Sequence, residues 1–231
     1  MHSGNFKVEK ITLIVAAAGV GKRMGLGYPK QFLAWDGKPL FIYPLLVAQN
    51  SNSVEKIIVV TGKESIETVK EFCEEFKIDK VIEVVEGGKE RQDSIGRALK
   101  YCKEEEIIAV QDGVRPFLKE KYFTSALELL SKDKEVAGVV VGVPVKDTIK
   151  IIDGENGISS TPDRATLFAA HTPQIFRGEV LKKAYERAEE EKFLGTDDSS
   201  LVERLGEKVK IFIGDYDNIK VTTQEDLKFL K

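Results

Sequence analysis

A glycine-rich loop with three cationic side chains is the segment of this sequence best suited to chemistry. The apolar residues 11–17 lead into it, and its glycines and cations are Gly19, Gly21, Gly25, Lys22, Arg23 and Lys30. Glycines allow backbone N–H groups to approach an anion closely, and the cations supply fixed positive charge. Because the cations directly follow a segment that reads as a buried strand, we favour a phosphate-binding loop over a solvated basic loop.

The spacing of this loop excludes one common phosphate-binding motif and disfavours another. In a P-loop a Ser or Thr follows the Gly-Lys pair and holds the metal ion, whereas Arg23 follows here and no glycine lies five positions before Gly21. The dinucleotide-binding motif is Gly-x-Gly-x-x-Gly with an acidic residue about 20 positions later. The interval from Gly21 to Gly25 is one residue too long, and the acidic residue is absent. An NAD-dependent oxidoreductase is therefore disfavoured.

Two further segments place polar side chains directly after predicted strands. Residues 87–94 begin with Gly87 and Gly88 and open a helix in which the Ser94 hydroxyl can face a nucleotide base; alternatively, Ser94 only suits a helix start. Asp112 follows the apolar residues 107–110, a usual place for a carboxylate that holds Mg²⁺ against phosphates. The alternative is that Asp112 pairs with Arg115 or caps the next helix.

The remaining candidates lie in the second half of the chain, and they are Thr148, Arg164, Thr172, Thr196 and Lys220. Thr196 or Asp197 also suits a helix N-cap, which does not exclude ligand binding. His171 has no second His or Cys at metal-ligand spacing, and a lone histidine is more often structural. We therefore do not include His171 among the catalytic residues.

Strands and helices alternate along the chain, which predicts an α/β fold with a mostly parallel sheet covered by helices on both faces. The expected strands are 11–17, 56–61, 80–85, 107–110 and 136–143, and residues 66–76 and 95–102 have helical apolar periodicity. The length of 231 residues suits one domain spanning residues 1–231. Ligands of such sheets bind outside the carboxyl ends of the strands, where the candidate residues fall.

Residues 144–164 depart from this pattern and predict a protruding β-arm. Residues 145–152 alternate in polarity, and residues 153–157 have turn composition. Ile149, Ile151 and Ile152 would stay in water unless a partner covered them. We therefore expect a homodimer formed through the arm, with a hairpin folded back on its own subunit as the alternative.

Composition narrows the protein class. The net charge of −3 implies no general attraction to nucleic acid. The N-terminus lacks the apolar core of a signal peptide, and no run of 18 apolar residues occurs, so we expect a soluble cytoplasmic protein with no membrane partner. Cys73 and Cys102 fall on apolar helical faces and are expected to be buried thiols.

In chain order these segments resemble the 2-C-methyl-D-erythritol 4-phosphate cytidylyltransferase family of the non-mevalonate isoprenoid pathway. The matching segments are residues 17–24, 29–31, 87–94, 112–116, 147–148, 163–164, 172–174, 196–197 and 218–220. The resemblance implies a Rossmann-like sheet with a β-arm that is exchanged in a homodimer. It also implies a nucleotidyltransferase that joins CTP to 2-C-methyl-D-erythritol 4-phosphate, giving CDP-methylerythritol and pyrophosphate. Mg²⁺ is the implied cofactor, and other divalent cations can substitute.

The resemblance also assigns a role to each candidate residue. The implied catalytic residues are Arg23, Lys30 and Lys220. The implied CTP-binding residues are Ala17, Ala18, Gly19, Gly21, Lys22, Arg23, Lys30, Gly88 and Ser94. The implied acceptor-binding residues are Asp112, Arg115, Thr148, Arg164, Thr172, Thr196 and Lys220, with Thr148 and Arg164 supplied by the neighbouring subunit. Asp112 is the implied metal ligand.

Several positions depart from the family pattern. Gln111, Gly113 and Val114 stand where many members have His and Ala-Ala, and His171 stands where Gln or Leu is usual. The same Asp-x-Val-Arg-Pro pattern is seen in D-ribitol 5-phosphate cytidylyltransferases, which gives an alternative acceptor. Residues 196–203 favour the methylerythritol enzyme. A protein that binds CTP without consuming it is a further alternative, although Asp112 together with Arg23 and Lys30 favours catalysis.

Overall fold

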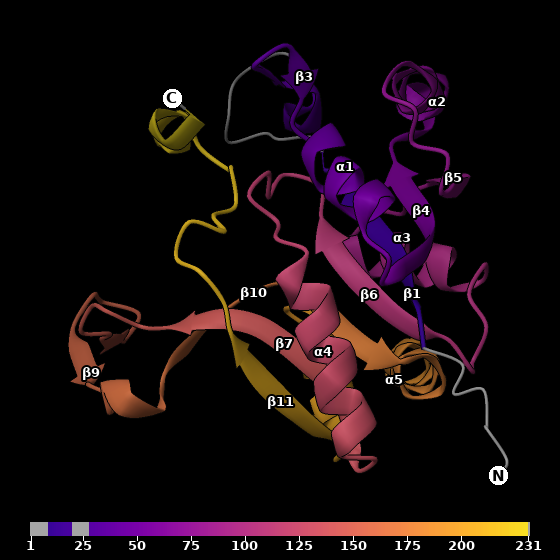
Figure 1. Cartoon of the computed structure of the whole chain (residues 1–231). Coiled ribbons are helices and arrows are strands. Elements are labelled where there is room, and N and C mark those ends of the chain that lie inside the picture. Colours follow the sequence, from indigo (N-terminus) through magenta and orange to yellow (C-terminus); the bar gives the residue numbers. More distant parts are fainter. Residues whose placement is uncertain (1–8, 20–27, 231) are drawn as a thin grey trace, which may run out of the picture.

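A seven-stranded sheet forms the centre of the protein in a computed structural model, which describes residues 9–19 and 28–230 (Figure 1). In spatial order its strands are β11 (Lys208–Ile213), β7 (Val136–Pro144), β10 (Phe168–Arg177), β6 (Ile107–Asp112), β1 (Ile11–Ala17), β4 (Val54–Thr61) and β5 (Val81–Glu86). All neighbours in this sheet are parallel except the pairs that include β10, which is antiparallel to β6 and β7. The predicted mostly parallel α/β fold is confirmed.

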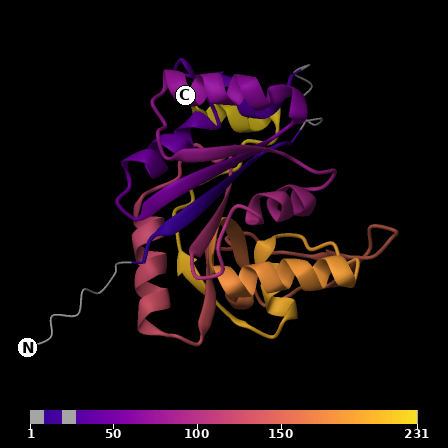
Figure 2. The same cartoon turned by 90° about the vertical axis from the view of Figure 1, so that its right-hand side faces the viewer.

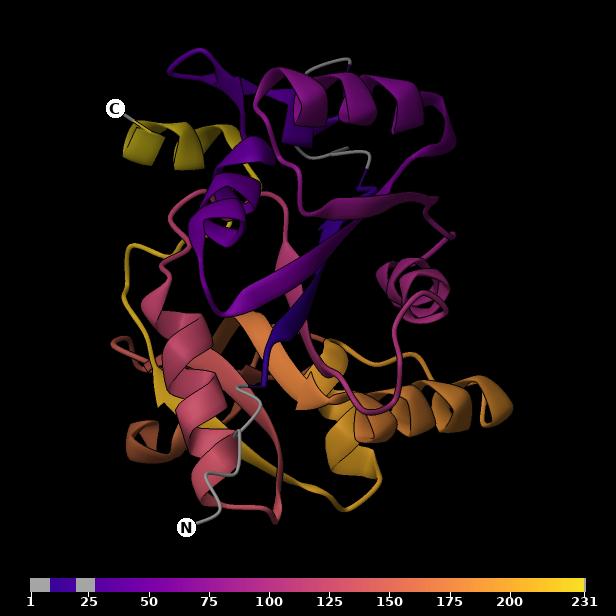
Figure 3. The same ribbon diagram turned by 45° about the vertical axis from the view of Figure 1, so that its right-hand side comes forward.

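Helices cover both faces of the sheet (Figure 3). One face packs against α1 (Ile42–Asn50), α2 (Ile66–Glu75) and α4 (Lys121–Lys132). The other packs against α3 (Arg91–Leu99), α5 (Gly178–Glu190) and α6 (Asp198–Arg204). A parallel strand covered on both faces needs apolar residues at consecutive positions, which is why the strand segments read as continuous apolar runs.

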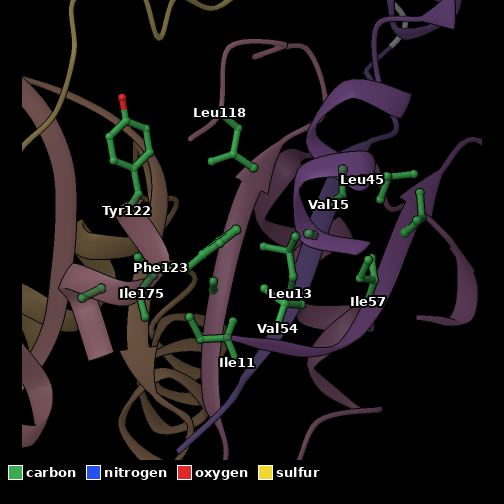
Figure 4. Packing of buried hydrophobic residues seen from close by; sticks show 14 of the residues in the cluster. Ile11, Leu13, Val15, Leu45, Val54, Ile57, Leu118, Tyr122, Phe123 and Ile175 are labelled. Carbon is green, nitrogen blue, oxygen red and sulfur yellow. The ribbon is translucent and has the colours of Figure 1, made fainter. Parts of the chain in front are cut away.

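Strand β1 illustrates this two-sided burial. Leu13 and Val15 belong to the core on the α1 side, where they pack near Leu45 and Ile57 (Figure 4). Ile14 points to the opposite face and belongs to the second core. Because β1 lies between β4 and β6, its carboxyl end is at the middle of the sheet edge that carries the candidate residues.

The C-terminal residues pack against elements from the start of the chain. The hairpin of β2 (Ala34–Trp35) and β3 (Lys38–Pro39) turns at Asp36 and Gly37, which both have positive φ, as a two-residue hairpin turn requires. A small apolar cluster joins Leu40 with residues near the C-terminus, Val221 and Leu230. Among the described residues the 3₁₀ helices are η2 (Lys30–Phe32), η3 (Lys63–Ser65), η4 (Arg164–Thr166) and η5 (Gln224–Leu230). Figure 2 shows η5 beside the N-terminal elements.

The predicted arm is present and projects from the sheet (Figure 1). It contains the two-stranded hairpin of β8 (Ile151–Ile152) and β9 (Ile158–Ser160). Asp153 shapes the turn, since its carboxylate accepts hydrogen bonds from the backbone N–H groups of Glu155 and Gly157. The isoleucines of the arm are exposed, so the arm is not folded back on its own subunit.

Strands β10 and β11 are not among the strands predicted from the sequence. Residues 169–173 lack the alternation of a typical strand, and the pairing of β10 with β7 shifts register between Ala170 and Gln174. Both predicted buried thiols are confirmed, and burial raises the pKa of Cys73 to about 11 and that of Cys102 to about 12. Among the described residues, no helix has the length and apolar character needed to cross a membrane.

Candidate active site

Asp112 lies at the carboxyl end of β6, where three cationic side chains surround its carboxylate. Lys220 Nζ lies 3.0 Å and Arg115 Nε 3.2 Å from Asp112 Oδ2, and Arg91 Nε lies 3.4 Å from Oδ1. The Asp112 backbone N–H donates to Thr172 Oγ1 at 3.0 Å. The structure thus brings together four predicted site residues from three separate segments of the sequence, and it adds Arg91.

The charges around Asp112 keep it ionised. Burial alone would raise the pKa of this carboxyl, which is only 5% exposed, but the charges of Lys220, Arg91 and Arg115 outweigh burial and hold the pKa well below its usual range. Because Arg91 also pairs with Asp198, the three cations face two carboxylates, which leaves an excess of one positive charge at this point. The site therefore attracts anions such as phosphates.

Arg91 is a site residue that the sequence reading missed. It is the first residue of α3, and its Nη2 donates to Asp198 Oδ2 at 2.8 Å. Asp198 is fully buried and also accepts a hydrogen bond from the Tyr185 hydroxyl. Arg91 precedes the predicted residue Ser94 by three positions, about one helical turn, so both side chains lie on the same side of α3. This spacing could have identified Arg91 from the sequence.

The C-terminal strap, residues 214–222, brings Lys220 to the site. Arg115 Nη1 donates to the Asn218 carbonyl at 2.7 Å, and Asn218 Nδ2 donates to the Thr172 carbonyl at 2.9 Å. The Val221 backbone N–H donates to the Val114 carbonyl at 2.9 Å. These bonds hold the strap across the carboxyl end of β6 and the middle of β10. Lys220 is therefore positioned by tertiary contacts rather than by a neighbouring helix or strand.

Close packing joins the opening loop to residues 87–94. A Cβ atom on Gly87 would lie 2.6 Å from the Ala18 Cβ, and one on Gly88 would lie 2.2 Å from the Asp93 Cβ. Both positions therefore require glycine. Ser94 Oγ accepts from the Gly88 N–H and donates to the Glu90 carbonyl, each at 3.0 Å. The two segments predicted to bind CTP are adjacent, and the Ser94 hydroxyl shapes the loop of residues 88–90 within the second segment.

The beginning of the opening loop is also adjacent to Asp112. Ala16 is the register partner of Asp112, and the Gly113 N–H donates to the Ala16 carbonyl at 2.9 Å. Ala17, Ala18 and Gly19 continue from there toward the loop. Gly21, Lys22 and Arg23 lie outside the described residues, and Lys30 begins η2 on the far side of the loop.

Thr196 and the arm residues make no hydrogen bond or ion pair with Asp112 within the described part of the chain. Thr196 is exposed, and the N-cap of α6 is Asp197, whose side chain accepts from the Ser200 N–H at 3.0 Å. Thr148 and Arg164 are exposed residues on or next to the arm, and within the described residues of this chain neither contacts Asp112. The structure of one subunit therefore does not bring these three residues to the carboxylate.

His171 is a partly buried histidine close to Arg115 and Asp112. Burial, followed by the charge of Arg115, lowers the pKa of His171 to about 4. Its Nδ1 is buried and has no hydrogen-bond partner among the described residues. At neutral pH the imidazole is therefore uncharged, and a pKa this low makes it a weak base.

Replacing His171 by Leu should flatten the pH dependence of stability in mildly acidic solution. The folded-state pKa of about 4 lies below the unfolded value of 6.5, so the unfolded state binds the extra proton. As pH falls from 6.5 toward 4, this histidine should cost the native protein on the order of 2 kcal/mol, and the variant should avoid that cost. Denaturant unfolding of both proteins between pH 4 and 7 measures the difference, and parallel curves would contradict it.

The donor set around Asp112 suits a metal ion that is held mainly by its substrate. No group of three or more His, Cys, Asp or Glu side chains in the described part of the chain is placed to hold a metal. Mg²⁺ binds through one or two carboxylates together with phosphate oxygens and water. The ionised Asp112 is such a carboxylate, so the residues present fit a phosphate-bound Mg²⁺.

Comparison with known proteins points to one family. The family model for 2-C-methyl-D-erythritol 4-phosphate cytidylyltransferase matches residues 11–230. The protein with that name from Fusobacterium nucleatum is 50% identical to this chain, and the match covers 100% of both chains. The one from Caldanaerobacter subterraneus is 43% identical, and the match covers 94% of this chain and 95% of the relative. The crystal structure of 4-diphosphocytidyl-2C-methyl-D-erythritolsynthase from Anaerococcus prevotii has a TM-score of 0.83 and 32% identity, covering 96% of this chain and 94% of that one.

Proposed function

This chain belongs to the 2-C-methyl-D-erythritol 4-phosphate cytidylyltransferase family, and we propose that it transfers the cytidylyl group from CTP to 2-C-methyl-D-erythritol 4-phosphate. An oxygen of the acceptor phosphate attacks the α-phosphorus of CTP. The bond from the α-phosphorus to the bridging oxygen breaks, and pyrophosphate leaves. The products are CDP-methylerythritol and pyrophosphate.

The cation cluster around Asp112 is the observation that supports this chemistry. Lys220, Arg91 and Arg115 converge on one carboxylate beside the end of β1, where the glycine loop begins. A phosphate monoester has a second pKa of about 6, so the acceptor is already ionised at neutral pH and needs no general base. The reaction then depends on bringing two polyanions together and stabilising the charge that develops between them.

We assign the CTP to the opening loop and the start of α3. Arg23 and Lys30 hold the triphosphate and stabilise the charge at the α-phosphorus, with Lys22 assisting. The backbone of the loop and of residues 87–94 contacts the cytidine. The complete set is Ala17, Ala18, Gly19, Gly21, Lys22, Arg23, Lys30, Gly88 and Ser94. The packing of Gly87 against Ala18 supports this assignment, because it joins the two segments.

We assign the acceptor phosphate to the neighbourhood of Asp112. Lys220 is 38% exposed in its side chain, so its ammonium group is able to reach a ligand while remaining beside Asp112. Arg115 and Thr172 line the same point, and Thr196 is the fourth residue that we assign to the acceptor in this subunit. Thr148 and Arg164 complete the acceptor site from the neighbouring subunit.

Asp112 would hold Mg²⁺ together with phosphate oxygens of CTP. When bound, the ion would neutralise phosphate charge and polarise the phosphorus–oxygen bonds. Without a ligand the carboxylate is held by Lys220 and Arg115, which fixes its orientation at the end of β6. Lys220, whose side chain is 38% exposed, remains available to the acceptor phosphate.

The alternative acceptor, D-ribitol 5-phosphate, is not supported by the comparisons, since the matching family and the relatives carry the methylerythritol name. Pyrophosphate release from CTP and Mg²⁺ with each acceptor in parallel tests this choice. We expect release with methylerythritol phosphate only. Release with ribitol phosphate alone would overturn the acceptor assignment, and CTP binding without release would indicate a sensor. Both substrates are charged and water-soluble, which agrees with a cytoplasmic enzyme.

We further propose a homodimer in which the arms of the two subunits are exchanged. Ile149, Ile151, Ile152 and Ile158 are exposed on the arm, and apolar surface of this kind is normally covered by a partner. Among the described residues Thr148 and Arg164 make no contact with Asp112 of their own subunit, and a partner's arm would supply them. The exposed apolar surface and the incomplete acceptor site thus support the same assembly.

Replacing Ile158 by Glu should dissociate this dimer. Ile158 is 64% exposed in the single chain, and burying a carboxylate in its place would raise the dissociation constant by about 100-fold. Ile82→Glu is a matched control, because Ile82 is 52% exposed on β5 at the opposite edge of the sheet. Sedimentation equilibrium at micromolar concentration measures both variants, and a monomeric native protein would contradict the proposal.

A further inference from the structure

Tyr216 connects the C-terminal strap to the base of the arm. Its hydroxyl donates to the Pro144 carbonyl at 2.9 Å, and the Lys146 ammonium lies 3.5 Å from the centre of its ring. Pro144 is the last residue of β7, and Lys146 lies two residues further into the arm. One side chain of the strap thus contacts the arm both through a hydrogen bond and through a cation–π interaction.

The strap has its own attachments to the body of the subunit. Asp215 Oδ2 accepts from the Tyr122 hydroxyl at 2.7 Å and lies 2.6 Å from Lys121 Nζ. The Gly214 N–H donates to the Gly142 carbonyl at 2.8 Å, and Lys119 Nζ lies 2.8 Å from Asp217 Oδ2. The backbone on both sides of Tyr216 is therefore held without the tyrosine side chain. Tyr216 is a fixed point against which the arm is held.

The contact reaches the arm residue that we assign to the neighbouring acceptor site. Arg164 Nη1 donates to the Lys146 carbonyl at 2.9 Å. Lys146 therefore joins the two legs of the arm to each other through its carbonyl and to Tyr216 through its ammonium group. An arm that turned at its base would move Arg164 with Lys146.

We propose that Tyr216 is a positioning residue that acts on the partner's active site. By fixing the base of its own arm, it orients Thr148 and Arg164 for the acceptor bound in the other subunit. This proposal rests on the proposed function and its arm-exchanged dimer. The alternative is a role in its own subunit through Lys220, four residues along the strap. The bonds of Asn218 and Val221 favour the first role, because they hold Lys220 independently of Tyr216.

Replacing Tyr216 by Ala should raise the KM for methylerythritol phosphate by roughly tenfold, since it removes one hydrogen bond and one exposed cation–π contact. The KM for CTP and kcat should stay near the native values, because the lost contact affects acceptor binding alone. Tyr216→Phe keeps the aromatic ring and should have a smaller effect. Tyr101→Ala is the matched control, since Tyr101 is 49% and Tyr216 46% exposed. An unchanged KM for the acceptor would overturn the proposal.

A mixed dimer separates the two roles. One subunit carries Tyr216→Ala, the other carries Lys30→Ala and Lys220→Ala, and differently tagged chains allow the mixed dimer to be purified. Its only active site lies in the Tyr216→Ala subunit and receives the arm of the other chain, which has an intact Tyr216. We expect a native KM for the acceptor at about half the native kcat, because one of two sites is active. A KM that stays raised would overturn the proposal.

Two measurements separate this proposal from the proposed function. Sedimentation of the native protein and of Tyr216→Ala establishes whether each is a dimer, and the homodimer carrying Lys30→Ala and Lys220→Ala shows whether those lysines are needed. A monomeric native protein would refute the dimer and the role of Tyr216 together. An active double variant would refute the catalytic roles alone, and the acceptor KM of the Tyr216→Ala homodimer would still decide whether Tyr216 positions the arm.

Discussion

Asp112→Asn should lower kcat by roughly three orders of magnitude. The substitution keeps the size of the side chain but removes the negative charge that would hold Mg²⁺ and that orients Lys220 and Arg115. Arg115, which is 7% exposed, would then be a buried cation without its carboxylate. We therefore also expect the free energy of unfolding to fall by about 3 kcal/mol.

Because stability also changes, the assay needs a check of the folded state. Far-UV circular dichroism and denaturant unfolding at the assay temperature establish that the variant is native. The matched control is Asp133→Asn, since Asp133 is also paired with two lysines, Lys208 and Lys210, but lies at the opposite end of the sheet. It should keep native turnover. A folded Asp112→Asn protein with more than about a tenth of native kcat would refute the role of this carboxylate.

Lys30→Ala should lower kcat by about two to three orders of magnitude while leaving the fold intact. Lys30 begins η2 at the end of the opening loop, and we assign it to the charge that builds at the α-phosphorus. This charge is larger in the transition state than in bound CTP, so its loss affects turnover more than CTP binding. Lys30→Arg should restore part of the activity, because it keeps the charge at a different position.

Lys100→Ala is the matched control for this variant. Lys100 is an exposed lysine at the C-terminal end of α3, whereas the predicted CTP-binding residues lie at its N-terminal end. Steady-state kinetics with both substrates measures kcat and the two KM values separately. A Lys30→Ala enzyme that changed only the KM for CTP would indicate a binding role without transition-state stabilisation. Near-native values throughout would refute the assignment.

The sequence predicted much of the fold because buried parallel strands have a clear residue pattern. Segments 11–17, 107–110 and 136–143 are nearly continuous apolar runs, and they form β1, β6 and β7. Strand β10 lacks this pattern because its residues 169–173 include His171 and Pro173 at an irregular pairing with β7. The family expected from the motifs is confirmed, as is the mostly parallel sheet. The assembly of two subunits remains a prediction.

The class of reaction, and the edge of the sheet at which we propose that it takes place, could be predicted from the sequence alone. Gly88 and Asp112 each follow a predicted strand, and parallel strands bring their carboxyl ends to one edge. The pairing of Asp112 with Arg115, three residues away, was an alternative that the sequence offered, whereas its contacts with Arg91 and Lys220 depend on tertiary packing. Arg91 pairs with Asp198 across 107 residues, and the strap delivers Lys220 through backbone bonds of Asn218 and Val221. Such contacts depend on how distant segments pack, and local residue patterns do not predict them.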